Sequence, residues 1–419
     1  MTTEDINIHI IGGGISGLIA AKTLEEFGFA PTILEGSDRL GGRVKTDVVD
    51  GYQLDQGFQV LLSNYPAALK YLDFAGLELQ EFRSGAAIYK KGNLSYIGDP
   101  MRDSSVLLTT LFSRVGTLKD KWRIFCLQND LKKKSIEKIF NTKEQTTMQY
   151  LKNYGFSPKI IKNFFKPFFS GIFLEEELVT SSRMFEFVFK MFAEGLAVLP
   201  KKGIEAIPQQ LASQLSKTKI KLNTKVKGIT DTVITLEDGS EITSEYTIIA
   251  TEASKLISNL KNQQIDWKSC DALYFTTPKR KIEKPFIGLI ANADALINNI
   301  FYHTSLDMEH RGADELLSVT VVKEHQLSEE ALVAQVKEEL KRECGIKNLT
   351  FVKRYQIPKA LPQLDNLQYE VSPSETQLKE RIFLAGDVQL NGSLNAAMLS
   401  GEKAALGLMQ VLGKTGVIQ

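Results

Sequence analysis

Hydrophobic positions near the start of the chain predict a βαβ unit. Residues 6–11 form a short apolar run rich in isoleucine, which is typical of a buried parallel strand. After a cluster of glycines, residues 18–27 have the composition of a helix, and Gly28 is a suitable residue to end it. A second apolar run at residues 31–35 predicts the strand that completes the unit.

The same alternation of strand-like and helix-like segments returns later in the chain. An Asp238–Gly239 pair between two apolar runs is a hairpin signal. We expect helices over residues 204–215, 328–342 and 394–412, and strands over residues 220–222, 233–236, 246–250, 272–276, 286–291, 316–322 and 382–385.

A different pattern separates these α/β segments. Residues 104–195 are rich in helix formers, and eleven of the 23 phenylalanines lie between Phe140 and Phe192. We therefore predict an α/β protein in which a discontinuous Rossmann-like domain carries an inserted α+β domain with a helical lobe. The expected boundaries are residues 1–75, 196–255 and 375–419 for the first domain and residues 76–195 and 256–374 for the second.

Composition and charge narrow the classes of partner. The chain has 419 residues, and its 51 Lys and Arg balance its 50 Asp and Glu, so we expect no nucleic-acid partner. Three distant cysteines and four scattered histidines lack the spacing of a disulfide framework or a metal site, so we expect no metal.

The N-terminus and the lengths of the apolar runs bear on location. The N-terminus is acidic where a signal peptide is basic, and no run reaches the roughly 18 uncharged apolar residues that a membrane-spanning helix needs. We expect a cytoplasmic protein. Peripheral contact with a membrane stays open, because the phenylalanine-rich residues 164–173 could line a tunnel, meet a membrane surface or pack as core.

The glycines after the first strand carry the clearest chemical signal. Residues 12–17 (GGGISG) satisfy the GxGxxG pattern between a strand and a helix. Gly12 permits the tight turn, Gly14 lets the backbone approach a pyrophosphate, and Gly17 lets the helix pack against the strand. The helix N-terminus offers free N–H groups to phosphates. Glu35, which ends the second strand, is placed to accept hydrogen bonds from ribose hydroxyls.

The residues that follow Glu35 indicate which dinucleotide is bound. Residues 39–43 (RLGGR) form an RxGGR motif, whose glycines permit close approach and whose arginines supply charge for a pyrophosphate. With residues 383–387 (FLAGD) and 392–401 (GSLNAAMLSG), this order of motifs resembles the superfamily of flavin-dependent amine oxidases, protoporphyrinogen oxidases and phytoene desaturases. A middle segment, residues 248–251 (IIAT), also resembles a strand end of that superfamily.

The resemblance spans nearly the whole chain and implies non-covalently bound FAD in the first domain and substrate in the second. It places Arg39 and Arg43 along the phosphates and the ribityl chain, and Asp387 at the ribityl or pyrophosphate region. The helix from Leu394 would point its positive end at the flavin pyrimidine edge. The residues implied for cofactor binding are Gly12, Gly14, Ile15, Ser16, Gly17, Glu35, Gly36, Arg39, Gly41, Gly42, Arg43, Gly57, Phe58, Val226, Thr251, Gly386, Asp387, Ser393, Leu394 and Asn395.

Departures from the amine oxidases of this superfamily bear on the substrate. Where they place a lysine near the flavin, this chain has Ser269, Cys270 or Asp271. Where they place an aromatic residue of the amine cage, it has Ser393, and the cysteine of covalent flavin attachment has no counterpart. The motif from residue 394 and residues 54–62 (LDQGFQVLL) resemble instead the carotenoid- and squalene-type desaturase branch.

We therefore expect an FAD-dependent oxidoreductase that transfers a hydride from a substrate C–H bond to flavin N5, and that dehydrogenates an apolar, isoprenoid-like small molecule. A flavin amine oxidase that forms hydrogen peroxide and a non-catalytic flavoprotein are the alternatives. The sequence has no second GxGxxG motif, which argues against a separate NAD(P)H domain. Oxygen or a quinone is therefore the expected electron acceptor. No catalytic residue is assigned: Asp271, Tyr355 and Lys359 are weak candidates.

Overall fold

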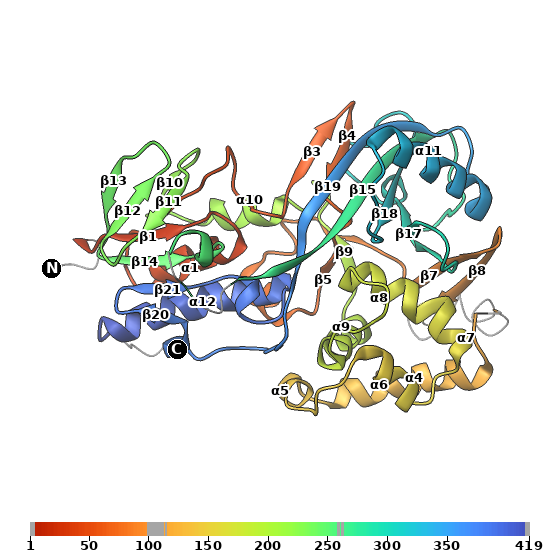
Figure 1. Cartoon of the computed structure of the whole chain (residues 1–419), viewed down its shortest axis with the longest axis horizontal. Coiled ribbons are helices and arrows are strands. Elements are labelled where there is room, and N and C mark those ends of the chain that lie inside the picture. Colours follow the sequence, from red (N-terminus) through yellow and green to blue (C-terminus); the bar gives the residue numbers. More distant parts are fainter. Residues whose placement is uncertain (1–4, 99–112, 114, 258–259, 261–263, 415–419) are drawn as a thin grey trace.

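The computed structural model describes residues 5–98, 113, 115–257, 260 and 264–414 (Figure 1). Residues 104–112 of the predicted helical region lie outside this part of the chain. One end of the molecule is built around a mostly parallel sheet, and the other around a long mixed sheet with a helical lobe below it in the view of Figure 1.

The first sheet is assembled from segments far apart in the sequence. Its strand order is β10-β2-β1-β14-β21-β20, and all neighbours are parallel except β20 and β21. These strands are β1 (Ile8–Ile11), β2 (Thr32–Leu34), β10 (Lys219–Lys221), β14 (Tyr246–Ile249), β20 (Gln377–Lys379) and β21 (Ile382–Leu384). The α/β fold class and the opening βαβ unit predicted from the sequence are confirmed.

Two helices pack closely on this sheet because glycines remove side chains at the contacts. α1 (Ile15–Glu26) follows β1, and α12 (Leu394–Val411) lies against α1. A methyl group on Gly17 would overlap the carbonyl oxygen of Gly12, and one on Gly401 would overlap that of Ser16. A third helix, α10 (Ala206–Ser213), also contacts α1.

The second sheet has seven strands in the order β19-β15-β18-β17-β16-β7-β8. Its strands are β7 (Gly85–Lys90), β8 (Asn93–Gly98), β15 (Asp266–Thr277), β16 (Ile287–Ile290), β17 (Ile297–Tyr302), β18 (Glu315–Val321) and β19 (Thr350–Gln363). The sequence analysis missed β7, β8, β17 and β19. β19 is half-buried and polar, and its two prolines argue locally against a strand, yet it pairs along most of β15.

A lobe of short helices extends from this sheet. Its members are α4 (Leu118–Lys133), α5 (Ile136–Phe140), α6 (Thr147–Asn153), α7 (Pro158–Ile160), the π-helical turn Ile161–Phe165, α8 (Lys166–Phe173) and α9 (Ser182–Glu194). Thr117 and Asp120 form a capping box that starts α4, and Thr146 and Gln149 do the same for α6. The helical region predicted from the sequence is confirmed over the described residues. None of the described helices is long and apolar enough to cross a bilayer.

Smaller elements complete the fold. They are β3 (Thr46–Val49) paired with β4 (Tyr52–Asp55), the sheet β5-β9-β6 (Leu61–Leu62, Ala197–Leu199, Gln80–Glu81), the sheet β11-β12-β13 (Val226–Ile229, Val233–Leu236, Glu241–Thr243), α2 (Pro66–Tyr71) and α11 (Glu329–Glu339). β12 and β13 pair antiparallel around the Asp238–Gly239 turn, which confirms the predicted hairpin.

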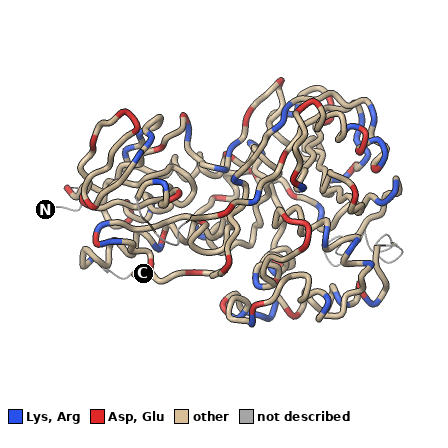
Figure 2. Tube along the Cα trace, viewed as in Figure 1, with Lys and Arg blue, Asp and Glu red and all other residues tan. Residues whose placement is uncertain are grey.

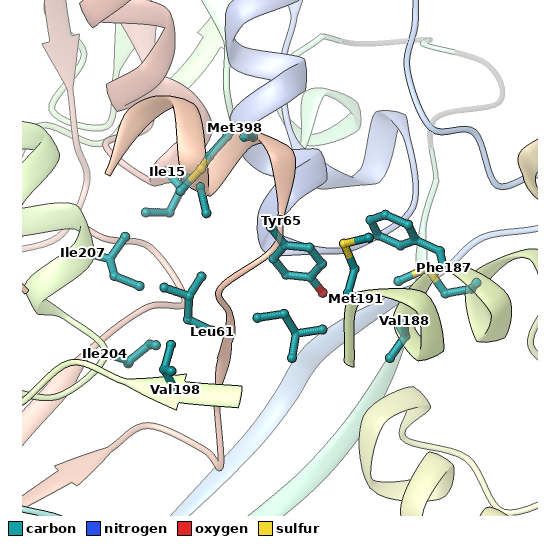
Figure 3. Close-up of a cluster of buried hydrophobic side chains, with 14 of the residues drawn as sticks. Ile15, Leu61, Tyr65, Phe187, Val188, Met191, Val198, Ile204, Ile207 and Met398 are labelled. Carbon is teal, nitrogen blue, oxygen red and sulfur yellow. The ribbon is translucent and has the colours of Figure 1, made fainter. Parts of the chain in front are cut away.

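The two halves of the molecule share one hydrophobic core. Figure 3 shows Ile15 of α1 and Met398 of α12 on one side, and Phe187 and Met191 of α9 on the other, with Tyr65 between them. All five side chains are buried, and Tyr65 stacks on Phe187 with ring centroids 5.7 Å apart. The helical lobe is therefore fixed to the first sheet by continuous apolar packing, which positions any cavity between them.

Gly401 offers a test of the contact between α1 and α12. In a helix interior, Gly→Ala ordinarily stabilises by about 1 kcal/mol, but here the methyl group would overlap the Ser16 carbonyl. We expect Gly401→Ala to lower the free energy of unfolding by about 1–3 kcal/mol in chemical denaturation. Gly228→Ala is the control, because its methyl group would meet only Leu256 O at 3.7 Å. A stabilised Gly401→Ala variant would contradict the packing described.

Candidate active site

The glycine loop between β1 and α1 has the backbone shape that the sequence predicts. Gly12 adopts a φ of 105°, which favours glycine, and its N–H donates to Leu34 O at 2.9 Å. Thr251, exposed after β14, lies beside Gly12. α1 begins at Ile15 and Ser16, and its N-cap Gly14 provides no side-chain hydrogen bond. The first N–H groups of this helix are therefore available to an anion.

Glu35 joins the glycine loop to the end of β2. Its carboxylate accepts hydrogen bonds from the N–H of Gly13 at 2.6 Å and from the N–H and hydroxyl of Ser37, both at 2.8 Å. A carboxylate has further lone pairs, so ribose hydroxyls can still donate to it. Gly36 follows and packs against Lys225, which precedes the buried Val226 at the start of β11.

The RxGGR loop lies against the glycine loop. Gly41 donates its N–H to Gly13 O at 2.9 Å, and it adopts a φ of 111°. A methyl group on Gly42 would stand 3.4 Å from the α-carbon of Gly14, so these two glycines face each other without side chains. The paired loops leave space of the kind that an extended phosphate chain requires.

The two arginines of the RxGGR motif have different partners. Arg39 donates to Asp47 at 2.6 Å and to Glu205 at 3.2 Å, so its guanidinium is already paired with carboxylates. Arg43 donates to Asp387. The predicted phosphate role of Arg39 stays a prediction, whereas Arg43 and Asp387, which lie 344 residues apart in sequence, are brought together at the site.

The C-terminal motif surrounds the start of α12. Gly386 donates its N–H to the Ser400 hydroxyl at 2.9 Å, which closes the turn that presents Asp387. Ser393 caps α12, accepting the N–H of Ala396 at 3.0 Å just ahead of Leu394. Asn395 is fully buried and accepts the N–H of Ala67 at 3.0 Å. Asn395 therefore ties α12 to α2, while Ser393 lines the adjoining cavity.

Gly57 and Phe58 lie at the opening from the cofactor loops into the second half of the molecule. Gly57 faces Ile357 of β19, where a methyl group would come within 2.9 Å of the isoleucine. Phe58 packs on Phe301 and on buried His303, with ring centroids 5.5 and 6.3 Å away. Phe58 also lines the cavity, so this segment connects the predicted cofactor residues with a substrate space.

These residues fit a flavin dinucleotide. The facing glycines provide a cradle that any Cβ would narrow, α1 offers an uncapped N-terminus, and Glu35 stands where a ribose acceptor is needed. Thr251, just after β14, lies beside Gly12, and Lys225, which precedes Val226 of β11, lies beside Gly36. Tertiary structure therefore brings three sequence motifs to one place, as the resemblance implied.

A cavity of about 1540 Å³ extends from the start of α12 into the helical lobe. It exceeds the about 300–1,000 Å³ of ordinary ligand pockets. The phenylalanine-rich region divides between cavity wall and core. Phenylalanines that line the cavity are Phe58, Phe82, Phe125, Phe164, Phe168, Phe173, Phe189 and Phe192. Those that are fully buried away from it are Phe165, Phe169, Phe185 and Phe187.

Lys268, which the sequence analysis did not consider, lies on the cavity wall one residue before Ser269. Its ammonium is bound by Glu175 at 2.6 Å, Phe173 O at 3.0 Å and Thr180 at 3.1 Å. No local signal distinguishes this lysine, because its partners come from the loop after α8. Lys268 thus balances a carboxylate inside a largely apolar space.

The weak catalytic candidates all have structural partners. Asp271 is buried and accepts from Arg354 at 2.5 Å and His325 at 3.0 Å. Tyr355 donates to Asp47 at 2.7 Å, which together with burial raises the pKa of its phenol. Lys359 pairs with Glu252. Burial raises the pKa of the Cys270 thiol to about 12, which keeps it protonated at neutral pH.

Comparison with known proteins agrees with this geometry. The model of the family described as flavin containing amine oxidoreductase matches residues 15–408. The chain belongs to this family. The predicted superfamily and the predicted FAD cofactor are thereby confirmed.

Curated relatives match over part of their length. A putrescine oxidase from Kocuria rosea is 36% identical over 89 residues, which cover 21% of this chain and 19% of the relative. The L-amino-acid oxidase BjussuLAAO-I from Bothrops jararacussu is 26% identical over 272 residues, covering 60% of this chain and 53% of the relative. The matched region thus spans about half or less of these relatives.

Solved structures match over nearly the whole chain. An oxidoreductase from Methanosarcina mazei has a TM-score of 0.72 at 16% identity, with 97% of this chain and 100% of the other covered. Wild-type putrescine oxidase bound to putrescine has a TM-score of 0.68 at 17% identity, with 97% and 99% covered. At this identity the likeness shows the shared fold.

A substitution at Gly14 can test cofactor binding without disturbing the fold. Its φ of −74° suits any residue, and a methyl group there would meet only the Gly42 α-carbon at 3.9 Å, so Gly14→Ala should fold normally. The methyl group would nevertheless occupy the space between the two loops. We expect FAD affinity to fall by about tenfold or more in a fluorescence titration. Gly228→Ala is the control, and unchanged affinity in Gly14→Ala would refute the phosphate position.

Asp55 ends β4, close to Gly57 in the chain. Its burial leads us to expect a free energy of unfolding that depends on pH. Its carboxylate accepts from Thr46 and from Ile204 N–H, yet complete burial raises its pKa from 3.8 to about 6. The folded state thus binds the proton more tightly than the unfolded state. The free energy of unfolding contributed by Asp55 therefore falls, by about 3 kcal/mol, as the pH rises from about 4 to above 6.

Asp55→Asn should remove this dependence while it keeps an acceptor for both donors. We expect the variant to gain stability relative to the natural protein between pH 4 and pH 7, measured by denaturant unfolding at each pH. Exposed Asp314→Asn is the control and should leave the pH profile unchanged. Parallel profiles for Asp55→Asn and the natural protein would show that Asp55 ionises normally.

Proposed function

We propose that this protein is an FAD-dependent oxidoreductase that dehydrogenates an apolar, isoprenoid-like small molecule. The observation that carries the proposal is the cavity of about 1540 Å³, which joins the predicted flavin end at Ser393 to a wall of phenylalanines. Burial of a long hydrocarbon against such side chains is favourable at about 25 cal/mol per Å² of apolar surface. The volume supports a long substrate rather than a small polar one.

The charges of the cavity support the same substrate class. Glu175 is paired with Lys268, and Glu176 lies 3.6 Å from Lys323, so these wall carboxylates already have cationic partners. Glu324 and Asp365 also border the cavity but are exposed at its edge. Of these carboxylates, Glu176 is also exposed, whereas the side chain of Glu175 is only 10% exposed. A protonated amine would therefore leave water for a space where the shielded carboxylate, Glu175, is already neutralised by Lys268, which is unfavourable.

When bound, FAD supplies the hydride acceptor for oxidation of a substrate C–H bond. The chain's own residues provide position and exclude water. Phe58, Phe164 and Phe168 line the cavity and offer apolar surface to the substrate. The N-terminus of α12, capped by Ser393, would offer its positive end to a flavin bound there and would favour the charge of the reduced cofactor. Oxygen or a quinone is proposed as the electron acceptor.

Amine oxidation is the second candidate function. It is favoured by the relatives, which include a putrescine oxidase and an L-amino-acid oxidase. Lys268, a lysine of strand β15 that lines the cavity, is a second observation in favour of amine oxidation. Against it stands the engagement of the Lys268 ammonium by three oxygen atoms.

Anaerobic flavin reduction separates these functions. We expect the oxidised flavin absorbance to bleach with long isoprenoid hydrocarbons and not with putrescine, spermidine or L-amino acids. Phe164→Glu, which places a charge on the apolar wall, should lower the reduction rate by about tenfold or more because the substrate must leave an unpaired carboxylate buried. Phe164→Leu is the matched control and should retain most of the rate.

Each other outcome favours a different function. Rapid bleaching by amines with peroxide formation on admission of air would establish an amine oxidase. FAD that binds stoichiometrically but is reduced by neither class would support a non-catalytic flavoprotein. Re-oxidation of the reduced protein by oxygen or by a soluble quinone then identifies the electron acceptor.

A further inference from the structure

The outer helix of the lobe exposes large apolar side chains at the cavity opening. Leu118, Trp122 and Phe125 of α4 are 69%, 64% and 37% exposed, and their spacing places them on one helix face. All three also line the cavity, as does Val179, which is 60% exposed. We call these four residues the apolar rim.

The apolar rim is concentrated rather than scattered. Nine large hydrophobic side chains are exposed among the described residues, and four of the nine surround this one opening. Isolated exposed apolar residues need no explanation, but a contiguous group at a cavity mouth marks an interaction surface. The rings of Trp122 and Phe125 are tilted against each other, with centroids 5.5 Å apart.

The lobe that carries the rim is basic although the chain is nearly neutral. Residues 117–194 contain fourteen Lys and Arg and nine Asp and Glu, whereas the whole chain has a net charge of +1. The excess lies in residues 117–166, with twelve Lys and Arg and four Asp and Glu, while three glutamates at residues 175–177 precede Val179. Asp120 is fully buried in the capping box of α4. Lys119, Lys132 and Lys133 of α4 are exposed, and Figure 2 shows Lys and Arg along this outer edge of the molecule.

We propose that the apolar rim docks on the surface of an anionic lipid bilayer, so that the cavity opens into the acyl region. Trp, Leu and Phe at an interface gain from burial among acyl chains, and neighbouring lysines gain from anionic headgroups. The docking proposal depends only on the apolar rim and the lysines around it. The further step, that an apolar substrate enters from the lipid, rests on the proposed function.

The charges favour lipid over the other occupants of an apolar face. A second copy placed symmetrically on the rim would oppose two basic lobes, which repel each other. A nucleic acid would use the lysines but would leave Leu118 and Trp122 without a partner. An anionic bilayer satisfies both the apolar side chains and the charge.

Vesicle sedimentation of the FAD-loaded protein tests the docking. We expect binding to vesicles of phosphatidylcholine with phosphatidylglycerol, and at least about tenfold weaker partitioning to phosphatidylcholine alone. Leu118, Trp122 and Phe125 replaced together by Ser should lower partitioning by about tenfold or more. The matched control replaces Val48, Leu69 and Val411 by Ser, three exposed apolar residues on other elements.

A charge variant tests whether lysines of α4 contribute to binding of the anionic lipid. Lys119, Lys132 and Lys133 replaced by Gln should lower partitioning to the anionic vesicles by about fivefold for each lysine removed, and should reduce its salt dependence. Lys219, Lys227 and Lys279 replaced by Gln provide the control, because they are exposed and lie outside the lobe.

Trp122 gives a readout of membrane contact in the natural protein, and a conservative variant is its control. The chain has two tryptophans, and only Trp122 is highly exposed. Brominated acyl chains should quench its fluorescence in the natural protein, and Trp122→Phe should abolish this quenching while it retains sedimentation with vesicles. Quenching that survives in Trp122→Phe would place the membrane contact elsewhere.

The outcomes distinguish the docking from the enzymatic proposal. No binding to anionic vesicles, or equal loss in the Leu118/Trp122/Phe125 variant and its control, would overturn the docking and leave the flavin chemistry untouched. Binding by a protein whose flavin is not reduced by isoprenoids would overturn the function and not the docking. A dimer in sedimentation that the rim substitutions dissociate would identify the rim as an interface between copies.

Discussion

The close backbone contact between α1 and its neighbours is the constraint on which the site depends. Gly17 lets α1 rest on the loop at Gly12, and Gly401 lets α12 rest on α1 at Ser16. A side chain at Gly17 would push α1 away from that loop, and one at Gly401 would push α12 away from α1. Because α1 and α12 each begin at a predicted cofactor loop, this separation sets the distance between the pyrophosphate end and the flavin end. The RxGGR loop then joins them through Gly41 and the Arg43–Asp387 pair.

The half with the glycine loop and the half with the helical lobe are packed together as one unit. Apolar side chains from α1, α12 and α9 meet around Tyr65, so the lobe that walls the cavity is packed on the helices that begin at the cofactor loops (Figure 3). The long strands β15 and β19 join the same two halves on another side (Figure 1). Close packing of this kind fixes the relative position of the two halves, which the proposed hydride transfer would require.

The three sequence motifs could be found from the sequence because the residues of each motif lie close together in the chain. The glycine loop, the RxGGR motif and the C-terminal motif each need particular backbone shapes within a few residues, so the residue types reveal them. Long-range partners were not predictable. Lys268 gives no local sign that Glu175 will bind it, and Arg39 gives none that Asp47 and Glu205 will. The strand β19 was missed because its pairing with β15, rather than its own polar composition, stabilises it.

The sequence by itself indicated the order of α/β and helical segments, because the hydrophobic period acts over short stretches of chain. Its motifs indicated the family and the FAD cofactor through their resemblance to a known superfamily. Only the tertiary structure decided which phenylalanines form a wall and which form core. Phe164 and Phe168 face the cavity while Phe165 and Phe169 are buried, although all four share one helical segment. That division depends on which neighbours cover each face of the helix, and those neighbours come from parts of the chain that no local pattern connects.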